Sequence, residues 1–264
     1  MTTGVPNYSW DDPFWEILRF YTSLRGTEQK TFLKDLESNV KPIGKWKETL
    51  GLDQDVSDEL IAYCRLRSSQ LTEALDLLRS EKEAQAFCKK AKIKWGTTAT
   101  KSKDHHQSSK ALIATVSSIA SDVCKTNKTT LEPNPQKRCI WLIDKKLHVS
   151  ARNLDGAIPS LRDPKIVWEI KEYWGKTSGG SKMSDAVYEC HLVGKEIREY
   201  EKRAKTRIYH LVFLDGKDQW LTRKSDLARF IDLKNQGVID RLFIGKEVET
   251  EFKDYLTNTI VADL

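Results

Sequence analysis

The sequence predicts an α/β protein, with a mixed β-sheet core flanked by helices and a helical N-terminal region. Before about residue 95, apolar residues recur at the spacing of amphipathic helices. After about residue 109, short β-branched and aromatic runs alternate with amphipathic segments, which is typical of layered α/β folds. Apolar residues make up 39% of the chain, enough for a substantial core. We therefore expect a helical recognition or dimerisation region at 1–95, a basic segment at 96–108 and the α/β core at 109–264.

Three helices are predicted in the N-terminal region. The first begins near Asp11, where two acids and Pro13 form a favourable start, and continues to Tyr21. The second runs from Ser57, as its cap, to Leu66, and the third covers about 70–90. None of the three carries a motif with recognisable chemistry.

The elements predicted after residue 108 alternate in type. In chain order they are a helix at 109–125, a turn at 132–136, a strand at 139–144 with a hairpin partner at 148–151, strands at 153–160 and 165–173, a helix at 184–203, a strand at 207–214, a helix at 225–236, a strand at 240–244 and a helix at 248–256. Strand 165–173 is the most apolar of these, and we expect it to be buried.

Positive charge is concentrated in one stretch. The chain has 44 basic and 38 acidic residues, a net charge of +6, and residues 89–110 alone carry seven Lys and one Asp. One interpretation is a solvated linker, because the composition after Trp95 is that of a flexible segment. The other is a DNA-contact segment in which Lys92, Lys94 and Lys103 bind phosphates.

Several classes of protein are excluded. No stretch approaches the ~20 apolar residues of a membrane helix, and the N-terminus lacks the basic start and apolar run of a secretory signal. The five cysteines are scattered and odd in number, which argues against a disulfide framework and a thiolate zinc site. We expect reduced thiols, a cytoplasmic protein and no membrane partner.

Two charged residues lie inside the most apolar strand. Glu169 and Lys171 are two apart, so their side chains share one face of the strand. Burying them is costly unless they pair or line a polar cleft. Asp155 lies fourteen residues upstream, before a glycine, and would converge with Glu169 if the two strands are neighbours. The alternative is a surface-facing Glu-x-Lys on an edge strand.

Two carboxylates and a lysine suit phosphodiester hydrolysis. The reaction needs a hard cation, a water of lowered pKa and positive charge near the developing phosphorane. Mg²⁺ is usually held by one or two carboxylates together with substrate phosphate oxygens. A lysine beside the cation can orient or deprotonate the water and neutralise the transition state. We therefore expect Mg²⁺ as cofactor.

At these residues the sequence resembles the PD-(D/E)xK nuclease superfamily, and within it a type II restriction endonuclease most. The resemblance rests on Asp155-Gly, then Glu169-Ile-Lys171, then a helix and the strand RIYHLVFL, and it covers about residues 108–245. It implies a restriction-endonuclease-like sheet core at 109–264. It also implies that Asp155 and Glu169 are metal ligands and that all three residues are catalytic, with Lys171 as the catalytic lysine.

The sequence departs from the family pattern in two places. Leu154 replaces the proline that precedes the first acid, a position that is loose in the superfamily, and helix 109–125 has no glutamate to serve as the extra acid of some members. Glu132 or Asp122 would be the substitutes for that acid.

Further DNA contacts are predicted after the strand. Tyr173 continues the alternation of Glu169 and Lys171, although a core aromatic is the alternative. Lys176 and Lys182 flank a Gly/Ser-rich loop whose helix N-terminus could hold a backbone phosphate, and the alternative is an ordinary loop. The spacing is not that of a nucleotide-binding P-loop.

The hypothesis is a Mg²⁺-dependent type II restriction endonuclease that cuts double-stranded DNA at a specific sequence. Cutting both strands of a symmetric site is simplest for a homodimer with one site per strand. Two alternatives remain open. One is another nuclease of the same fold, in repair, phage defence or nicking. The other is a non-catalytic DNA-binding protein in which Asp155, Glu169 and Lys171 form a buried ion network.

Overall fold

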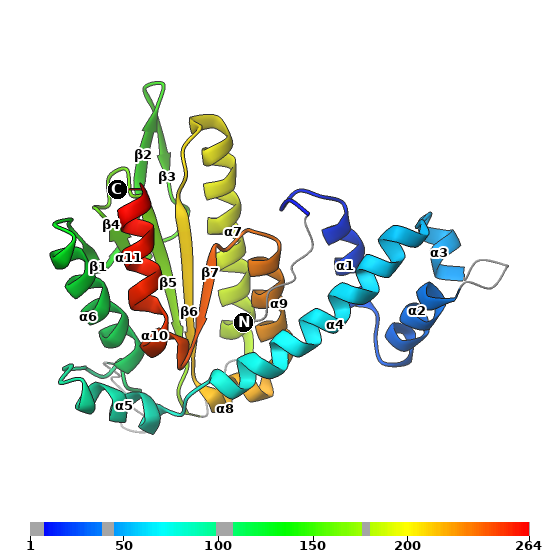
Figure 1. Cartoon of the computed structure of the whole chain (residues 1–264), viewed down its shortest axis with the longest axis horizontal. Helices are drawn as coiled ribbons and strands as arrows, with labels where there is room; N and C mark the ends of the chain where they lie inside the picture. The colour runs from blue at the N-terminus through cyan, green and yellow to red at the C-terminus, as the bar shows by residue number, and fades with distance from the viewer. Residues whose placement is uncertain (1–7, 39–44, 99–107, 176–179, 264) are drawn as a thin grey trace.

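A five-stranded mixed sheet forms the centre of the molecule, with helices on both faces (Figure 1). The computed structural model describes residues 8–38, 45–98, 108–175 and 180–263. The sheet has the order β1-β4-β5-β6-β7, and β2 and β3 form a separate hairpin. The strands are β1 (Glu132–Lys137), β2 (Ile140–Ile143), β3 (Lys146–Val149), β4 (Leu154–Ile158), β5 (Ile166–Glu172), β6 (Tyr209–Asp215) and β7 (Arg241–Ile244). The predicted class, a mixed α/β sheet flanked by helices, is confirmed.

Strand direction follows from the connections. β1, β4 and β5 pair antiparallel, whereas β5, β6 and β7 pair parallel. A parallel pair needs a crossover, which α7 (Gly180–Ala204) supplies between β5 and β6. The short helix α8 (Lys217–Thr222) and α9 (Lys224–Asn235) connect β6 to β7.

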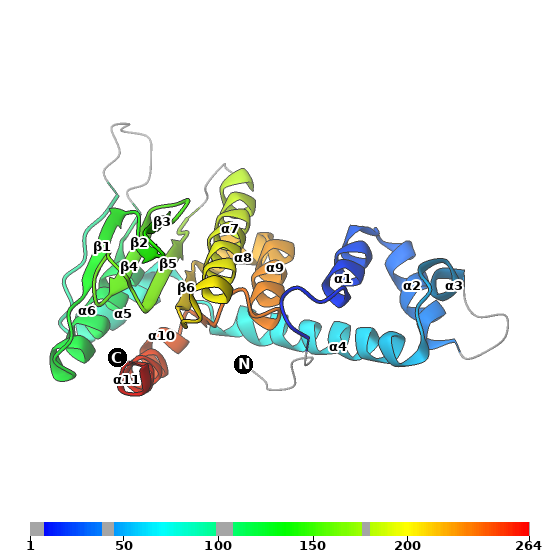
Figure 2. The ribbon, with the colours of Figure 1, turned by 90° about the horizontal axis from the view of Figure 1, so that it is seen from above.

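Each face of the sheet has its own apolar core. Trp168 and Ile170 of β5 pack with α6 (Ala111–Thr126) and α11 (Phe252–Asp263). Val167 points to the other face and packs with residues of α7. Figure 2 shows α11 and α7 on opposite sides of the sheet. The two-residue alternation expected of strand 165–173 is therefore confirmed.

The N-terminal helices form a cluster of their own around the first half of a long helix. The helices are α1 (Phe14–Ser23), α2 (Thr27–Glu37), α3 (Lys45–Leu50) and α4 (Gln54–Leu77). The buried side chains of the cluster are Phe14, Trp15, Leu18, Phe32, Leu36, Leu60, Ile61 and Tyr63. The second half of α4 lies on α9, where Arg67 Nε is 2.7 Å from Asp232 Oδ1 and Asn235 donates to Gln70.

Two predictions about the N-terminal region need correction. The helices expected at 57–66 and 70–90 are instead one continuous helix, α4, followed by a break and then α5 (Glu81–Lys90). Ser80 caps α5 and forms a capping box with Glu83, a strong start signal that the helical periodicity alone does not reveal. Because α5 packs against α6 in the core, the change from helical cluster to α/β core falls near residues 78–80, not at 95.

The segment expected as a turn at 132–136 is strand β1. It contains two prolines and residues with positive φ at Asn134 and Gln136, and its pairing with β4 is irregular between Pro133 and Lys137. An edge strand tolerates such residues because one of its sides has no partner strand. The prolines and the residues with positive φ therefore mark an irregular edge strand rather than a turn.

The two ends of the basic segment lie together. Thr98 N donates to Ser108 O at 2.8 Å, and Lys110 N donates to Gly96 O at 2.9 Å. Residues 96–98 and 108–110 therefore lie side by side, and the helices that precede and follow them, α5 and α6, pack in the same core. Within the described ranges, no helix has the length and apolarity needed to cross a membrane.

Candidate active site

Asp155 and Glu169 lie on adjacent strands. In the β4–β5 pair, Gly156 is opposite Trp168 and Ala157 is opposite Val167. Continuing this register by one residue sets Asp155 opposite Glu169, and opposite residues of a pair share one face of the sheet. A Cβ atom on Gly156 would lie 1.8 Å from the Trp168 ring, so glycine at this position permits the close approach.

Glu169 is buried, with a polar partner for each oxygen. Its side chain is on the face covered by α7, and the residue is only 2% exposed. Oε2 lies 3.0 Å from Lys171 Nζ and Oε1 lies 3.2 Å from His210 Nε2. Burial opposes the charged form, but Lys171 and His210 lower the pKa of Glu169 to about 2.

Lys171 bridges two carboxylates. Its Nζ also donates to Glu189 Oε2 on α7, at 3.0 Å. Burial disfavours the ammonium form, yet Cys190, Glu169 and Glu189 raise the pKa of Lys171 above its usual value. Because β5 is a central strand and this pair is buried, the alternative of a surface-facing Glu-x-Lys on an edge strand is wrong.

Asp155 is less enclosed and is fixed by two donors. Oδ2 accepts from Ile170 N and Oδ1 accepts from Gln136 Nε2, both at 2.7 Å. Burial raises the pKa of Asp155, and the nearby charge of Glu169 adds to the rise, whereas these hydrogen bonds and Lys171 oppose it. The carboxylate is thus held beside β5 while it remains partly accessible.

Arg152 and Glu189 form the outer edge of the cluster. The guanidinium group of Arg152 pairs with the second carboxylate oxygen of Glu189, and both side chains are partly exposed. Glu189 therefore reaches from α7 toward Lys171 and joins it to Arg152. We refer below to Asp155, Glu169, Lys171, Glu189 and Arg152 as the carboxylate–lysine site.

Sequence reasoning missed Arg152, Gln136 and His210. The first two lie in irregular segments, where no periodicity indicates which way a side chain points. His210 carried a signal, because it is a polar residue within the apolar strand RIYHLVFL and is fully buried. A buried polar group requires a hydrogen-bond partner, but the sequence does not show that the partner of His210 is Glu169.

A family model that describes a domain of unknown function, DUF7687, matches residues 78–259. This is more than half of the chain. The chain belongs to the DUF7687 family. The DUF7687 domain begins at Leu78, directly after α4, and includes the whole carboxylate–lysine site. No curated protein and no solved structure is significantly similar to the chain.

Three residues after β5 in the DUF7687 domain, Tyr173, Lys176 and Lys182, are predicted to contact DNA. Tyr173 packs against Trp220, with ring centroids 5.7 Å apart, and its hydroxyl donates to Lys182 O at 3.4 Å. Burial raises the pKa of Tyr173 to about 12, in keeping with a core aromatic. The side chain of Lys182 is exposed at the first turn of α7. Lys176 lies outside the described residues.

Among the described lysines of the basic segment, Lys92 and Lys94 form no hydrogen bond or ion pair with the carboxylate–lysine site. Lys92 and Lys94 are exposed after α5, and Lys92 has a positive φ. Lys103 lies outside the described residues. The positions of Lys92 and Lys94 leave both interpretations of this segment open, as a DNA-contact segment or as a solvated linker.

The donors of the site suit a hard cation. Among the described residues, no group of three His, Cys, Asp or Glu side chains is arranged to hold a metal ion by itself. Asp155 and Glu169 supply two carboxylates on one face, and Mg²⁺ typically takes one or two carboxylates and completes its shell with water and substrate phosphate. The chemistry of this pair of carboxylates therefore fits a hard cation such as Mg²⁺.

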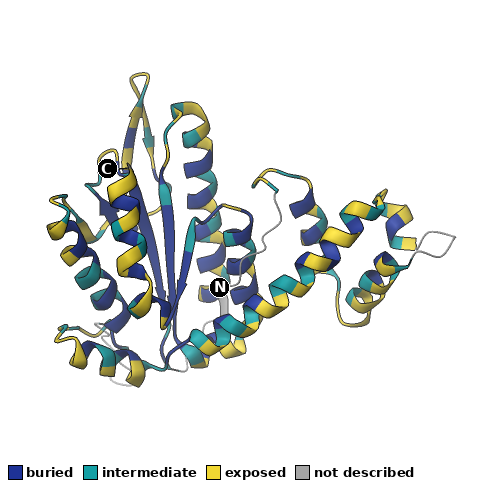
Figure 3. Ribbon diagram, in the orientation of Figure 1, coloured by how far each residue is buried: buried dark blue, intermediate teal, exposed yellow. Residues whose placement is uncertain are grey.

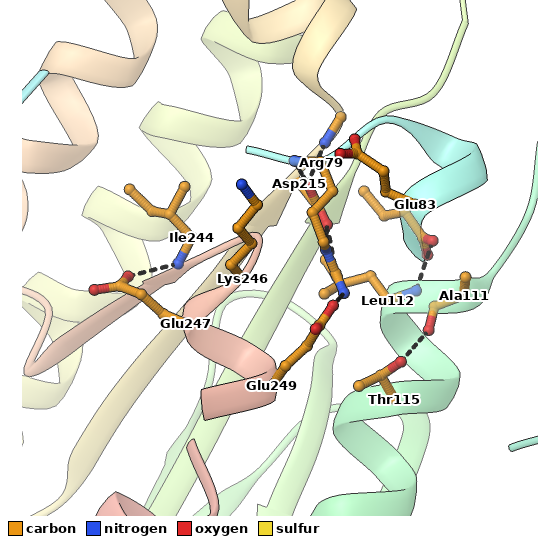
Figure 4. A network of polar contacts seen from close by, with 12 residues as sticks. Arg79, Glu83, Ala111, Leu112, Thr115, Asp215, Ile244, Lys246, Glu247 and Glu249 are labelled. Atoms are coloured by element: carbon orange, nitrogen blue, oxygen red, sulfur yellow. Dashed lines mark hydrogen bonds and ion pairs between the residues drawn. The ribbon is translucent and has the colours of Figure 1, made fainter. Parts of the chain in front are cut away.

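A second polar network attaches helices to the C-terminal ends of the parallel strands (Figure 4). Arg79 Nε donates to Asp215 Oδ2 at 2.6 Å and its guanidinium also pairs with Glu249. Glu172, the last residue of β5, accepts from Leu112 N at 2.8 Å at the start of α6. Burial raises the pKa of Glu172 to about 7. We assign this network to the attachment of α5, α6 and α10 (Glu247–Thr250) to the sheet.

Proposed function

We propose that the protein is a Mg²⁺-dependent endonuclease of double-stranded DNA, similar to a type II restriction endonuclease. One observation carries the proposal. Asp155, Glu169 and Lys171 share a face of two adjacent strands, with Lys171 Nζ 3.0 Å from Glu169. This is the arrangement that the resemblance to PD-(D/E)xK nucleases leads us to expect of two metal ligands and a catalytic lysine.

The chain's own residues have separate roles in this proposal. Asp155 and Glu169 would hold the cation through carboxylate oxygens. When bound, Mg²⁺ supplies a Lewis acid and a water of lowered pKa. Lys171 places a positive charge beside the scissile phosphate, where it stabilises the charge that develops on the phosphate oxygens. The Ile170 amide and Gln136 keep the Asp155 carboxylate in one orientation.

A homodimer is the proposed form that cuts both strands, because a two-fold axis would present one carboxylate–lysine site to each strand. Another nuclease of the same fold, in repair, phage defence or nicking, would use the same residues without requiring that symmetry. A non-catalytic DNA-binding protein is favoured by a different observation. Lys171 is already paired with both Glu169 and Glu189, as a purely structural ion network requires.

Incubation of the purified full chain with supercoiled plasmid distinguishes these functions. We expect discrete fragments with Mg²⁺ and none with EDTA. Asp155→Ala should abolish cleavage while DNA binding without Mg²⁺ persists, because it removes a metal ligand and a negative charge near phosphate. Asp254→Ala, which removes an exposed carboxylate on α11, is the matched control and should cut normally. Smearing would favour a non-specific nuclease, and a gel shift without cleavage would favour the binding protein.

A further inference from the structure

The β2–β3 hairpin carries an exposed apolar face. It projects beyond the sheet, and its strands are largely exposed in Figure 3. Ile140 is paired with Val149 and Leu142 with Leu147, so the four side chains lie on one face of the hairpin. Their exposed fractions range from 39% to 69%. A contiguous apolar face of this kind on a water-exposed element indicates a binding surface.

Contacts made by the opposite face hold the hairpin against the core and leave those four residues uncovered. Trp141 is buried there, its indole Nε1 donates to Pro164 O at 3.0 Å, and its ring lies 5.8 Å from that of Tyr200 on α7. The turn residues Asp144 and Lys145 both have positive φ, the geometry of a tight two-residue hairpin turn. The hairpin is thus anchored by one face and presents the other to solvent.

The charged residues in and beside the hairpin favour one occupant for its apolar face. Exposed basic residues outnumber the acids Asp144 and Asp163. The basic residues are Lys137, Arg138, Lys145, Lys146 and Arg162. A second copy of the hairpin would bring these like charges together, and four side chains cover much less than the ~1,200 Å² of a stable protein interface. Duplex DNA avoids both objections. Its phosphates attract the basic residues, and the sugars and bases inside its grooves offer a small apolar surface to the four side chains.

We propose that the β2–β3 hairpin enters the minor groove of duplex DNA. Leu142 and Leu147 have no hydrogen-bonding side chain, so they act by packing against sugars and by wedging a base step rather than by reading base edges. Lys145 and Lys146, at the turn and directly after it, contact the flanking phosphates. This inference rests on the proposed function and states how the same substrate is held.

The hairpin is physically connected to the carboxylate–lysine site. Three residues after Val149, Arg152 pairs with Glu189, which holds Lys171. The intervening Ala151 N donates to Glu196 Oε2 on α7 at 2.9 Å. DNA held by the hairpin is therefore held by a segment that leads directly into the proposed site.

The test compares Leu142→Ser/Leu147→Ser with Val261→Ser, which changes an exposed aliphatic residue on α11. Affinity for a duplex that contains 2-aminopurine is measured with Ca²⁺ in place of Mg²⁺, by anisotropy and by 2-aminopurine fluorescence. We expect the double variant to bind about tenfold or more weakly and to lose the fluorescence increase that reports unstacking. The control should match the wild type. Circular dichroism and thermal melts verify that all three proteins fold.

The outcomes separate this inference from the proposed function. If the wild type neither binds nor cuts duplex DNA, the proposed function fails and the hairpin proposal fails with it. If the wild type binds and cuts but the double variant binds equally well, only the hairpin proposal is overturned. If sedimentation shows a wild-type dimer and a monomeric double variant with unchanged DNA affinity, the face binds a second copy, and the proposal is also overturned.

Discussion

His210 on β6 holds Glu169 on β5 from inside the molecule. Its Nε2 lies 3.2 Å from Glu169 Oε1, and its Nδ1 lies 3.3 Å from the carbonyl oxygen of Val238. A Cβ atom on Gly194 of α7 would lie 3.2 Å from Nδ1 and 2.3 Å from a methyl carbon of Val238. Helix α7 therefore limits the space around the imidazole. The orientation of the Glu169 carboxylate thus depends on β5, which carries it, on His210 of β6 and on the close approach of α7 at Gly194.

Replacement of His210 by Ala should impair both stability and cleavage. Glu169 would keep Lys171 but lose one buried partner, which costs about 1–3 kcal/mol. We expect a lower melting temperature and a higher Mg²⁺ concentration for half-maximal cleavage, with partial recovery in His210→Gln, whose amide can still donate. A loss of stability without any change in the Mg²⁺ requirement would assign His210 to packing alone.

Lys171→Met tests whether the lysine acts in catalysis or only in folding. Removing one partner of a buried ion pair costs on the order of 3–5 kcal/mol. Removing transition-state charge stabilisation costs ~3–4 kcal/mol or more, which is several orders of magnitude in rate. We expect the variant to bind DNA, to lose cleavage and to regain melting temperature with Ca²⁺, which would neutralise the two carboxylates.

The matched control for this experiment is Lys253→Met, on the exposed side of α11. A large fall in the melting temperature of Lys171→Met, with no recovery in Ca²⁺ and no cleavage by the wild type, would contradict the nuclease proposal.

Changing Lys92, Lys94 and Lys103 to Ala tests the basic segment. If these residues contact phosphates, affinity should fall for all DNA sequences alike. The slope of log K against log salt concentration should also become shallower by roughly 0.9 per lost contact. Anisotropy titrations at several salt concentrations measure both quantities. An unchanged slope would favour the interpretation of the segment as a solvated linker.

Glu172 should make stability depend on pH. Its pKa is raised from 4.5 to about 7 in the folded protein, so the folded state favours the protonated form. This contribution to stability is complete below the unfolded pKa of 4.5 and is lost as the pH rises through about 7. Glu172→Gln stays neutral and can still accept from Leu112 N. Its melting temperature should therefore rise relative to the wild type between about pH 5 and about pH 8. A constant difference across this range would show that Glu172 does not titrate there.

The alternation of side chains along β5 predicted the shared face of Glu169 and Lys171 but not the contact of Glu169 with His210. The two-residue spacing of Glu169 and Lys171 is sufficient to place them on one face, and the 3.0 Å contact between them agrees. Asp155 could be placed because its strand is consecutive with β5 and pairs with it directly. His210 could not be assigned to Glu169, because their contact depends on a parallel pairing across a 25-residue helix.

Errors in the fold also have particular causes. The Ser-Ser-Gln run at 68–70 has modest helix propensity, but α4 continues through it because Gln70 is buried against Asn235 of α9. The prolines of β1 argue against a strand, but a sheet edge permits them. In both places a tertiary contact outweighs the local preference.

The continuous helix α4 fixes the distance between the N-terminal helical cluster and the sheet. Its 24 residues span about 36 Å, with the second half attached to α9 and the first half surrounded by α1, α2 and α3. The N-terminal cluster is consequently set at one distance and one rotational phase from the sheet. Each residue inserted midway along α4 would turn the cluster by about 100° and shift it by about 1.5 Å. Helical phase, more than helix length, therefore determines which surface of the cluster faces a partner bound to the core.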